Sequence, residues 1–358
     1  MATIGDRVRA AMSSAAIQQK QLAASVGMTP DALSRALNGQ RGFAAVELAD
    51  IARVLDADIH ELITGEPDPL RFTLSARHSF DHATGARSVD GAARDEPVLE
   101  NIRLAYAQAG EIPPNRELPA TPAAARELLG DGFVPDFVQC LEGLDVDVVV
   151  VGELSTAYTF LEGERSVIAI QATGNWFHQN WSLAHELGHL ALGHRGVIVE
   201  NGGDGRDEAA ANAFAAELLL PEREMVAIDW RSISLPELAD LVWEAGVSTR
   251  ALRSRMDTLR LEPSERVGAA LELKTQTLLR KHWRATRAGD PITERTTAAT
   301  ARAFPVWLRA AHLDEIAAGR IGKGTLAWML EVDPELLQVD EPAPPDQISG
   351  ADLEALLG

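Results

Sequence analysis

The sequence predicts a multidomain protein that is mainly α-helical and contains one small β-sheet. At 358 residues the chain is long enough for two or three domains of ordinary size. Apolar residues recur at helical spacing along most of the chain, whereas only residues 146–151, 158–161 and 166–170 have the composition of strands. A stretch rich in Pro, Gly and polar residues interrupts this periodicity over residues 66–97.

These patterns define the expected domain organisation. We expect an all-helical domain at 1–65, a linker at 66–97, an α+β domain at 98–262, a helical extension at 263–330 and an acidic tail at 331–358. The tail contains eight acidic residues and no basic one, whereas the preceding segment has a net charge of about +5. The tail also contains a Pro-rich stretch, which is typical of a weakly structured terminus.

Composition and charge exclude several classes of protein. The chain has 33 basic and 53 acidic residues, so its surface should repel nucleic acid and anionic membranes unless basic residues are locally concentrated. Cys140 is the single cysteine, which excludes an internal disulfide framework and any multi-thiolate metal site. The richest apolar run of the chain, Val148 to Val151, is far too short to cross a bilayer. We therefore expect a cytoplasmic protein that does not bind membranes.

The elements follow in order from periodicity and breakers. Residues 4–64 predict five short helices, and Glu162-Gly163-Glu164 has the length of a hairpin turn between two of the strands. Pro221 closes the second of two helices that follow the sheet. The remaining predicted helices are at 99–106, 122–129, 136–144, 180–194, 206–220, 235–245, 248–259, 265–288 and 351–357.

The strongest functional motif is His185-Glu186-Leu187-Gly188-His189 on a predicted helix. Two histidines four residues apart project from one helical face and can share a zinc ion, while Glu186 is turned toward a metal-bound water. An accidental copy of this pattern would simply place two histidines on a surface. The metzincin pattern does not continue, because Leu192 and Arg195 stand where that pattern requires glycine and histidine.

Glu208 is the best candidate for the third ligand. It lies on the next predicted helix, four residues before Asn212, so both side chains share a face. The carboxylate can complete a zinc shell, and the Asn212 oxygen can accept the outward N–H of a ligand histidine. Three alanines between them allow close packing of the two helices. The alternative is that Glu208 is a solvated carboxylate at a helix start, beside Asp207.

The segments 181–189 and 208–221 resemble the ImmA/IrrE family of zinc metallopeptidases, and the likeness extends over about residues 127–261. This resemblance implies a zincin-like fold, with His185, His189 and Glu208 as ligands and Glu186 as catalytic base. It implies one Zn²⁺ per chain, with Mn²⁺ as the alternative metal. One departure from the family pattern is Asn180-Trp181-Ser182, where a basic residue and Phe are usual.

Peptide hydrolysis also needs a group that stabilises the oxyanion. His178 and Tyr158 are the two candidates, and the sequence does not choose between them. Each also has a simpler interpretation, as a loop histidine and as a strand tyrosine.

Residues Gln21 to Gly39 have the pattern of a helix, a glycine turn and a second helix that begins at Thr29-Pro30. The region Asp6 to Thr64 resembles the Xre family of repressor domains, which implies a helix-turn-helix that binds double-stranded DNA. In such domains the second helix enters the major groove, where Arg35 suits guanine and Asp31 suits cytosine. The candidate DNA-binding residues are Gln19, Gln21, Thr29, Pro30, Asp31, Ser34, Arg35, Asn38 and Arg41. This unit has six basic and seven acidic residues, so a protein-binding helical module is the alternative.

Together these features predict a DNA-binding transcription regulator with zinc-dependent endopeptidase activity. The resemblance implies a protein substrate, typically a transcriptional repressor cleaved in a stress or mobile-element response. We expect a DNA operator and a homodimer as further partners. The alternative is a DNA-binding regulator whose metal site is structural or sensory and cleaves nothing.

Overall fold

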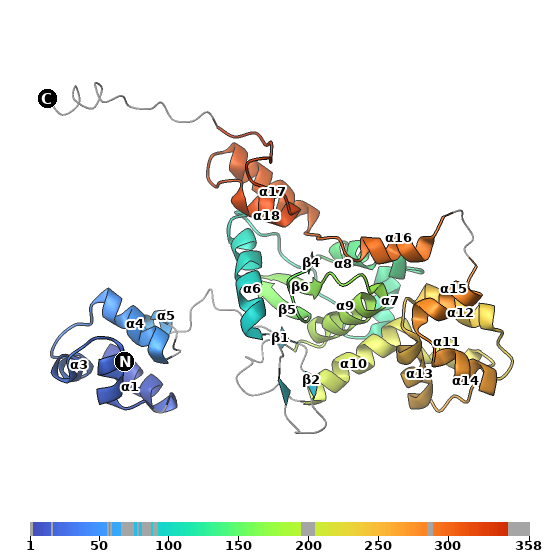
Figure 1. Cartoon of the computed structure of the whole chain (residues 1–358), viewed down its shortest axis with the longest axis horizontal. Coiled ribbons are helices and arrows are strands. Elements are labelled where there is room, and N and C mark those ends of the chain that lie inside the picture. The colour runs from blue at the N-terminus through green and yellow to red at the C-terminus, as the bar shows by residue number, and fades with distance from the viewer. Residues whose placement is uncertain are drawn as a thin grey trace. The chain divides into compact units, whose positions relative to one another are not determined.

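The computed structural model describes residues 3–15, 17–55, 57, 59–65, 92–194, 205–284 and 289–342, and three two-residue strands between positions 75 and 88. The chain divides into two compact units, Met1–Phe72 and Thr73–Gly358. Helices dominate both, and the described strands lie in the second unit, in a four-stranded and a two-stranded sheet (Figure 1). The predicted fold class is therefore confirmed: a helix-turn-helix unit comes first, and an α+β domain follows it.

Five helices form the described part of the first unit, as the periodicity predicts. A side-chain capping box between Thr3 and Asp6 begins the first helix, and Gly27 takes a positive φ of 66° in the turn between the second and third. Leu22, Leu33 and Ile51 are fully buried in the centre of this unit. The helices are α1 (Ile4–Ser14), α2 (Gln19–Ser25), α3 (Pro30–Leu37), α4 (Ala45–Leu55) and α5 (Ile59–Thr64).

The sheet of the second unit has the order β1-β5-β6-β4 in the described residues. Strand β4 (Val146–Val151) pairs in parallel with β6 (Arg165–Gln171), and β5 (Tyr158–Glu162) pairs antiparallel with β6. The three predicted strands and the hairpin at Gly163 are thus present.

Short strands also occur inside the segment that was predicted to be a linker. Strand β1 (Ser75–Ala76) pairs with β5, and β2 (Ser79–Phe80) pairs with β3 (Arg87–Ser88).

Helices precede and follow this sheet in the chain, and the last described helix ends at Leu330. The elements before the motif are α6 (Ala92–Ala107), α7 (Pro122–Leu129), the 3₁₀ turn η1 (Val134–Asp136) and α8 (Phe137–Glu142). The two helices with the candidate ligands are α9 (Trp176–Ala191) and α10 (Gly205–Leu219). The later helices are α11 (Glu222–Ala227), α12 (Leu235–Ala245), α13 (Thr249–Thr258), α14 (Glu265–Leu271), α15 (Thr275–His282), α16 (Pro291–Ala298), α17 (Val306–Ala317) and α18 (Gly324–Leu330).

Three helix predictions differ from the structure. Helix α6 begins at Ala92 and contains Pro97 as its sixth residue, where the helix lacks the N–H that would bond to the Ala93 carbonyl. Helix α9 begins at Trp176 because the side chain of Asn175 caps it. The single long helix predicted at 265–288 is wrong. It is broken between α14 and α15, where the Thr249 hydroxyl donates a hydrogen bond to the Leu273 carbonyl.

One hydrophobic core extends across residue 262, the predicted end of the α+β domain. It includes Phe137 and Leu183 and continues through Val267 in α14, Leu278 in α15 and Ile292 in α16. Helices α17 and α18 pack against α6. In the predicted acidic tail, Glu341 forms a 3.4 Å ion pair with Lys323, so residues 331–342 return to the helices. The helix predicted at 351–357 lies outside the described residues.

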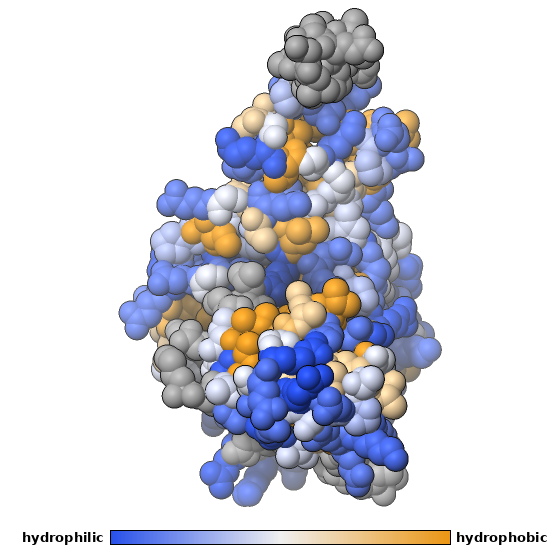
Figure 2. Space-filling view, turned by 90° about the vertical axis from the view of Figure 1, so that its left-hand side faces the viewer, coloured by the Kyte–Doolittle hydropathy of each residue, from blue (hydrophilic) through white to orange (hydrophobic). Residues whose placement is uncertain are grey.

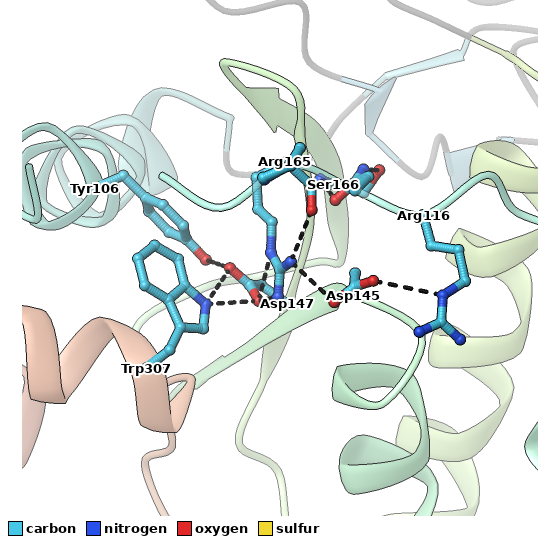
Figure 3. A network of polar contacts seen from close by, with 9 residues as sticks. Tyr106, Arg116, Asp145, Asp147, Arg165, Ser166 and Trp307 are labelled. Carbon is cyan, nitrogen blue, oxygen red and sulfur yellow. Dashed lines mark hydrogen bonds and ion pairs between the residues drawn. The ribbon is translucent and has the colours of Figure 1, made fainter. Parts of the chain in front are cut away.

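A buried polar network fastens helices to the sheet (Figure 3). Asp147, fully buried on β4, accepts hydrogen bonds from Arg165 Nη2 at 2.8 Å and from Tyr106 Oη at 2.9 Å. The indole Nε1 of Trp307 donates to the same carboxylate at 3.0 Å. Helix α6, helix α17 and strand β6 are therefore tied by one side chain to β4, the edge strand of the sheet.

The face drawn in Figure 2 is mostly hydrophilic and carries small, separate hydrophobic patches. Among the described helices, we find none with both the length and the apolar content that a bilayer crossing requires.

Candidate metal centre

Helices α9 and α10 pack against each other closely enough to share a site. Gly188 makes this approach possible, because a Cβ there would lie 3.1 Å from the Cβ of Phe214 and 3.2 Å from the Cα of Ala211. Ala211 is itself fully buried. The small residues at this crossing bring the histidines of α9 next to the carboxylate of α10.

Three candidate ligand atoms converge between these helices. His185 Nε2 lies 3.4 Å from Glu208 Oε2, and His189 Nε2 lies 3.4 Å from Glu208 Oε1. The two Nε2 atoms are 3.1 Å apart. In the described part of the chain, this is the group of three side chains with the geometry to hold a metal ion. Both imidazoles are buried, whereas the Glu208 side chain is 20% exposed.

The contacts of these side chains fit a bound cation. His185 Nδ1 lies 3.2 Å from Asn212 Oδ1. Since an amide oxygen only accepts, Nδ1 carries the proton, and in a neutral ring Nε2 presents a lone pair to the cluster. That lone pair faces a carboxylate, and a positive charge between them relieves the repulsion. Two nitrogens and a carboxylate are a donor set that zinc prefers.

The cluster also favours the ionised form of Glu208. Burial acts against the ionised carboxyl of Glu208, yet its contacts with His185 and His189 hold its pKa well below the usual range. Burial favours the neutral ring of His189, but Glu208, Glu186 and Asp207 outweigh that effect and raise its pKa. The site therefore concentrates negative charge around two imidazoles.

Glu186 lies beside this cluster on α9 and is 1% exposed. Its Oε2 accepts a hydrogen bond from the hydroxyl of Thr159 on β5. Its Oε1 is buried and has no hydrogen-bond partner among the described residues. One oxygen of the carboxylate is thus fixed, and the other is buried with its hydrogen-bonding capacity unused.

The candidate DNA-binding residues lie on and around α2 and α3. The Thr29 hydroxyl accepts a hydrogen bond from the Ala32 amide and caps α3. Arg35 pairs with Asp31 at 3.2 Å, and both side chains are more than half exposed. Of the nine candidates, the exposed ones are Gln21, Thr29, Pro30, Asp31, Arg35 and Asn38, and the half-buried ones are Gln19, Ser34 and Arg41.

Two further candidates, Arg41 and Asn38, are also engaged within the unit. Both Glu47 oxygens accept hydrogen bonds from Arg41, and Asn38 Oδ1 accepts one from Arg9. A phosphate contact by Arg41 therefore requires this ion pair to open. Within the described residues, Arg35 pairs with an exposed partner on its own helix, so it is more accessible than Arg41.

Comparison with known families agrees with both units. Residues 3–62 match the helix-turn-helix domain, and residues 144–257 match the IrrE N-terminal-like domain of peptidase family M78. The chain carries a helix-turn-helix domain followed by an IrrE-like domain. The first belongs to a DNA-binding class, and the second has a metallopeptidase-like fold. No curated protein and no solved structure matches the chain.

The geometry argues against both oxyanion candidates in the IrrE-like domain. Tyr158 precedes Thr159 in β5, and neighbouring strand residues point to opposite faces, so Tyr158 points away from Glu186. Its hydroxyl donates to Asp95 at 2.8 Å, and its pKa is raised by burial and by that carboxylate. His178 is exposed and lies seven residues before His185 on α9, a helical rise of about 10 Å.

Two further side chains of the IrrE-like domain lie at the candidate site: His194 contacts His189, and Thr159 contacts Glu186. His194 Nδ1 lies 3.1 Å from His189 Nδ1, and His194 Nε2 lies 3.6 Å from Asp207 Oδ1. In the sequence, His194 lies one residue before the position of the third metzincin histidine, and no pattern predicts its contact with His189. Thr159 has no sequence signal, because its contact with Glu186 joins a strand to a helix 27 residues away.

Proposed function

We propose that this protein is a DNA-binding transcription regulator that also acts as a zinc-dependent endopeptidase. Its substrate would be a regulatory protein, in the first instance a transcriptional repressor, cleaved in a stress or mobile-element response. The observation that carries this proposal is the convergence of His185, His189 and Glu208 beside a buried Glu186 with one unoccupied oxygen. The match to a metal-dependent peptidase family supports it.

The residues of the site divide into those that would hold the metal ion and one, Glu186, that would take part in proton transfer. His185, His189 and Glu208 would hold Zn²⁺, with Mn²⁺ as the alternative metal. When bound, such an ion supplies Lewis-acid polarisation of a peptide carbonyl and lowers the pKa of water. Asn212 would keep the His185 ring in the tautomer that presents Nε2. His194 would orient the His189 ring from its Nδ1 side.

Glu186 would be the catalytic base. Through Oε1 it would take a proton from the attacking water and deliver it to the leaving amine. The hydrogen bond from Thr159 to Oε2 keeps the carboxylate from rotating away. Because Glu186 is 1% exposed, its carboxylate would act in an environment of low dielectric constant. In such an environment the electrostatic effect of a fixed charge on the reacting groups is strong.

The helix-turn-helix domain would place α3 in the major groove of an operator. Arg35 would contact a guanine edge, while Gln21 and Asn38 would contact phosphates. A homodimer would match a two-fold symmetric site. Tethering the peptidase to DNA would raise its effective concentration near promoter-bound substrates.

The experiment compares wild-type protein with Glu186→Gln, each loaded with zinc. Both are incubated with a mixture of unfolded cellular proteins, and new amino termini are counted by mass spectrometry. We expect new termini with wild type, at least 100-fold fewer with Glu186→Gln, and about one zinc in each, because the base is not a ligand.

Two results would overturn the peptidase proposal. Equal cleavage by both proteins would show that Glu186 is not the base. Zinc in both with cleavage in neither would favour a structural or sensory metal site, and DNA binding would then be the remaining activity. An exposed glutamate on α12, replaced as Glu244→Gln, is the matched control and should cleave like wild type.

A further inference from the structure

The edge of β5 that faces away from β6 is covered only in part. β6 pairs with β5 along the whole length of β5. On the other edge, β1 pairs with β5 at two positions, Thr159 with Ser75 and Tyr158 with Ala76. Among the described residues, no strand pairs with residues 160–162 on that edge. The backbone groups of an open edge can form hydrogen bonds with a further extended segment.

This edge lies beside the proposed catalytic base. The hydroxyl of Thr159 donates a hydrogen bond to Glu186. Paired residues of neighbouring antiparallel strands have Cα atoms about 5 Å apart, so the backbone of Ser75 lies one strand spacing from Thr159. In Figure 1, β1 lies at the β5 end of the sheet, opposite β4. A segment that adds to this edge therefore passes the residue that fixes the base.

An extended peptide segment is the partner that fits such an edge. Peptides bind many proteins by adding a strand to an exposed sheet edge, and main-chain hydrogen bonds then supply the affinity. Strand β5 has five residues, whereas β1 pairs with only two of them. A segment that pairs with all of β5 gains more backbone hydrogen bonds than β1 provides, which allows it to displace β1.

The strand that covers this edge comes from the chain between the two domains. The match to the helix-turn-helix domain ends at residue 62, and the match to the IrrE-like domain begins at residue 144. Strand β1 lies between these limits. The position beside the base is therefore filled by this chain itself.

We propose that β1 is an internal competitor of the substrate, and that an extended segment of a substrate protein must displace it from β5 to reach Glu186. This inference rests on the proposed endopeptidase function. The rate of cleavage then depends on how often β1 leaves the edge. A folded region has no free strand to add, so the edge selects extended segments.

The test breaks the pairing of β1 with two prolines, Ser75→Pro and Ala76→Pro, in one full-length variant. Neighbouring strand residues present their N–H groups to opposite edges, so one of the two prolines removes the N–H that faces β5. The matched control is Arg87→Pro with Ser88→Pro, which breaks the separate pair of β2 and β3. A milder variant, Ser75→Gly with Ala76→Gly, weakens β1 and keeps both N–H groups. Circular dichroism checks that each variant remains folded.

The first measurement is the cleavage rate of each zinc-loaded protein in the new-termini assay. We expect the β1 proline variant to cleave about fivefold faster than wild type, in line with the net worth of one hydrogen bond. The glycine variant should be about twofold faster, and the β2–β3 control should equal wild type. Cleavage by all proteins at the same rate would overturn the inference and leave the peptidase proposal intact.

The second measurement needs no cleavage. Each β1 variant is placed in a Glu186→Gln background, and fluorescence anisotropy follows binding of a labelled peptide with the sequence of residues 71–80. We expect the β1 proline variant to bind this peptide about fivefold more tightly than Glu186→Gln alone, because its own β1 no longer competes. The same peptide with prolines at the positions of Ser75 and Ala76 should bind to neither protein.

This measurement separates the two proposals. If no protein cleaves, the peptidase proposal fails, and peptide binding still decides whether β1 occupies a peptide-binding edge. Equal affinity of both proteins for the peptide, or no saturable binding to the folded β1 proline variant, would overturn the inference.

Discussion

Replacing Asp147 by alanine tests the buried network that fastens α6 and α17 to the sheet. The change leaves the guanidinium of Arg165, 5% exposed, without its closest acceptor. It also removes the acceptor of the Tyr106 hydroxyl and of the Trp307 indole N–H. Breaking a buried ion pair from one side costs about 3–5 kcal/mol. We therefore expect the free energy of unfolding of the second unit to fall by about 4 kcal/mol.

The assay is urea unfolding of the full-length protein, followed by tryptophan fluorescence. A double variant, Asp147→Ala with Arg165→Met, should recover about 2 kcal/mol, because it also removes the buried charge whose closest acceptor the single variant deletes. Asp257→Ala is the control, since its pair with Arg253 is exposed, and it should change stability by less than about 1 kcal/mol. The reasoning is refuted if Asp147→Ala also stays within 1 kcal/mol, or if the double variant recovers nothing.

Three further predictions concern single side chains. Burial raises the pKa of Glu162 to about 7, from an ordinary 4.5, although Arg103 opposes the shift. The folded protein then holds this proton more tightly than the unfolded chain, so stability falls as pH rises from about 4.5 to 7. In urea unfolding, Glu162→Gln should therefore be more stable than wild type by about 1 kcal/mol at pH 8 and equal to it at pH 4. Thr159→Val should lower the cleavage rate about tenfold in the new-termini assay while zinc is retained, because Glu186 loses its fixed hydrogen bond. Arg35→Ala should weaken operator binding about tenfold in a fluorescence-anisotropy titration.

Each of these predictions has a contrary outcome. An equal gain for Glu162→Gln at both pH values would mean that ionisation is not its cause. Zinc loss in Thr159→Val would place the threonine in the metal-holding framework instead of beside the base. Arg53, an exposed arginine on α4, is the control for Arg35, and equal weakening by Arg53→Ala would indicate a general charge effect.

The periodicity of the sequence predicts most elements because tertiary contacts agree with local preference. Pro122 with Thr121 before it defines the start of α7, and the valine run defines β4. The break between α14 and α15 could not be predicted, since it depends on a hydrogen bond from Thr249 across the fold. The continuation of the core past residue 262 could not be predicted either, because it depends on packing between residues far apart in the sequence.

The candidate site also contains residues that the sequence predicts and one, Thr159, that it does not. His185, His189, Glu208 and Asn212 follow from spacing along helices, because a repeat of four places side chains on one face. Thr159 could not be found this way, since no local pattern says which strand faces α9. Once that face is known, strand alternation places Tyr158 on the other side, and the oxyanion group is left without a sequence candidate.

The most direct test of the central claim is the zinc content of the purified protein, measured by elemental mass spectrometry after dialysis against a weak chelator. We predict about one zinc per chain in wild type and in the exposed control Glu244→Ala, and less than about one tenth of that in Glu208→Ala. No zinc in wild type, or a full complement in Glu208→Ala, would contradict the three-ligand site.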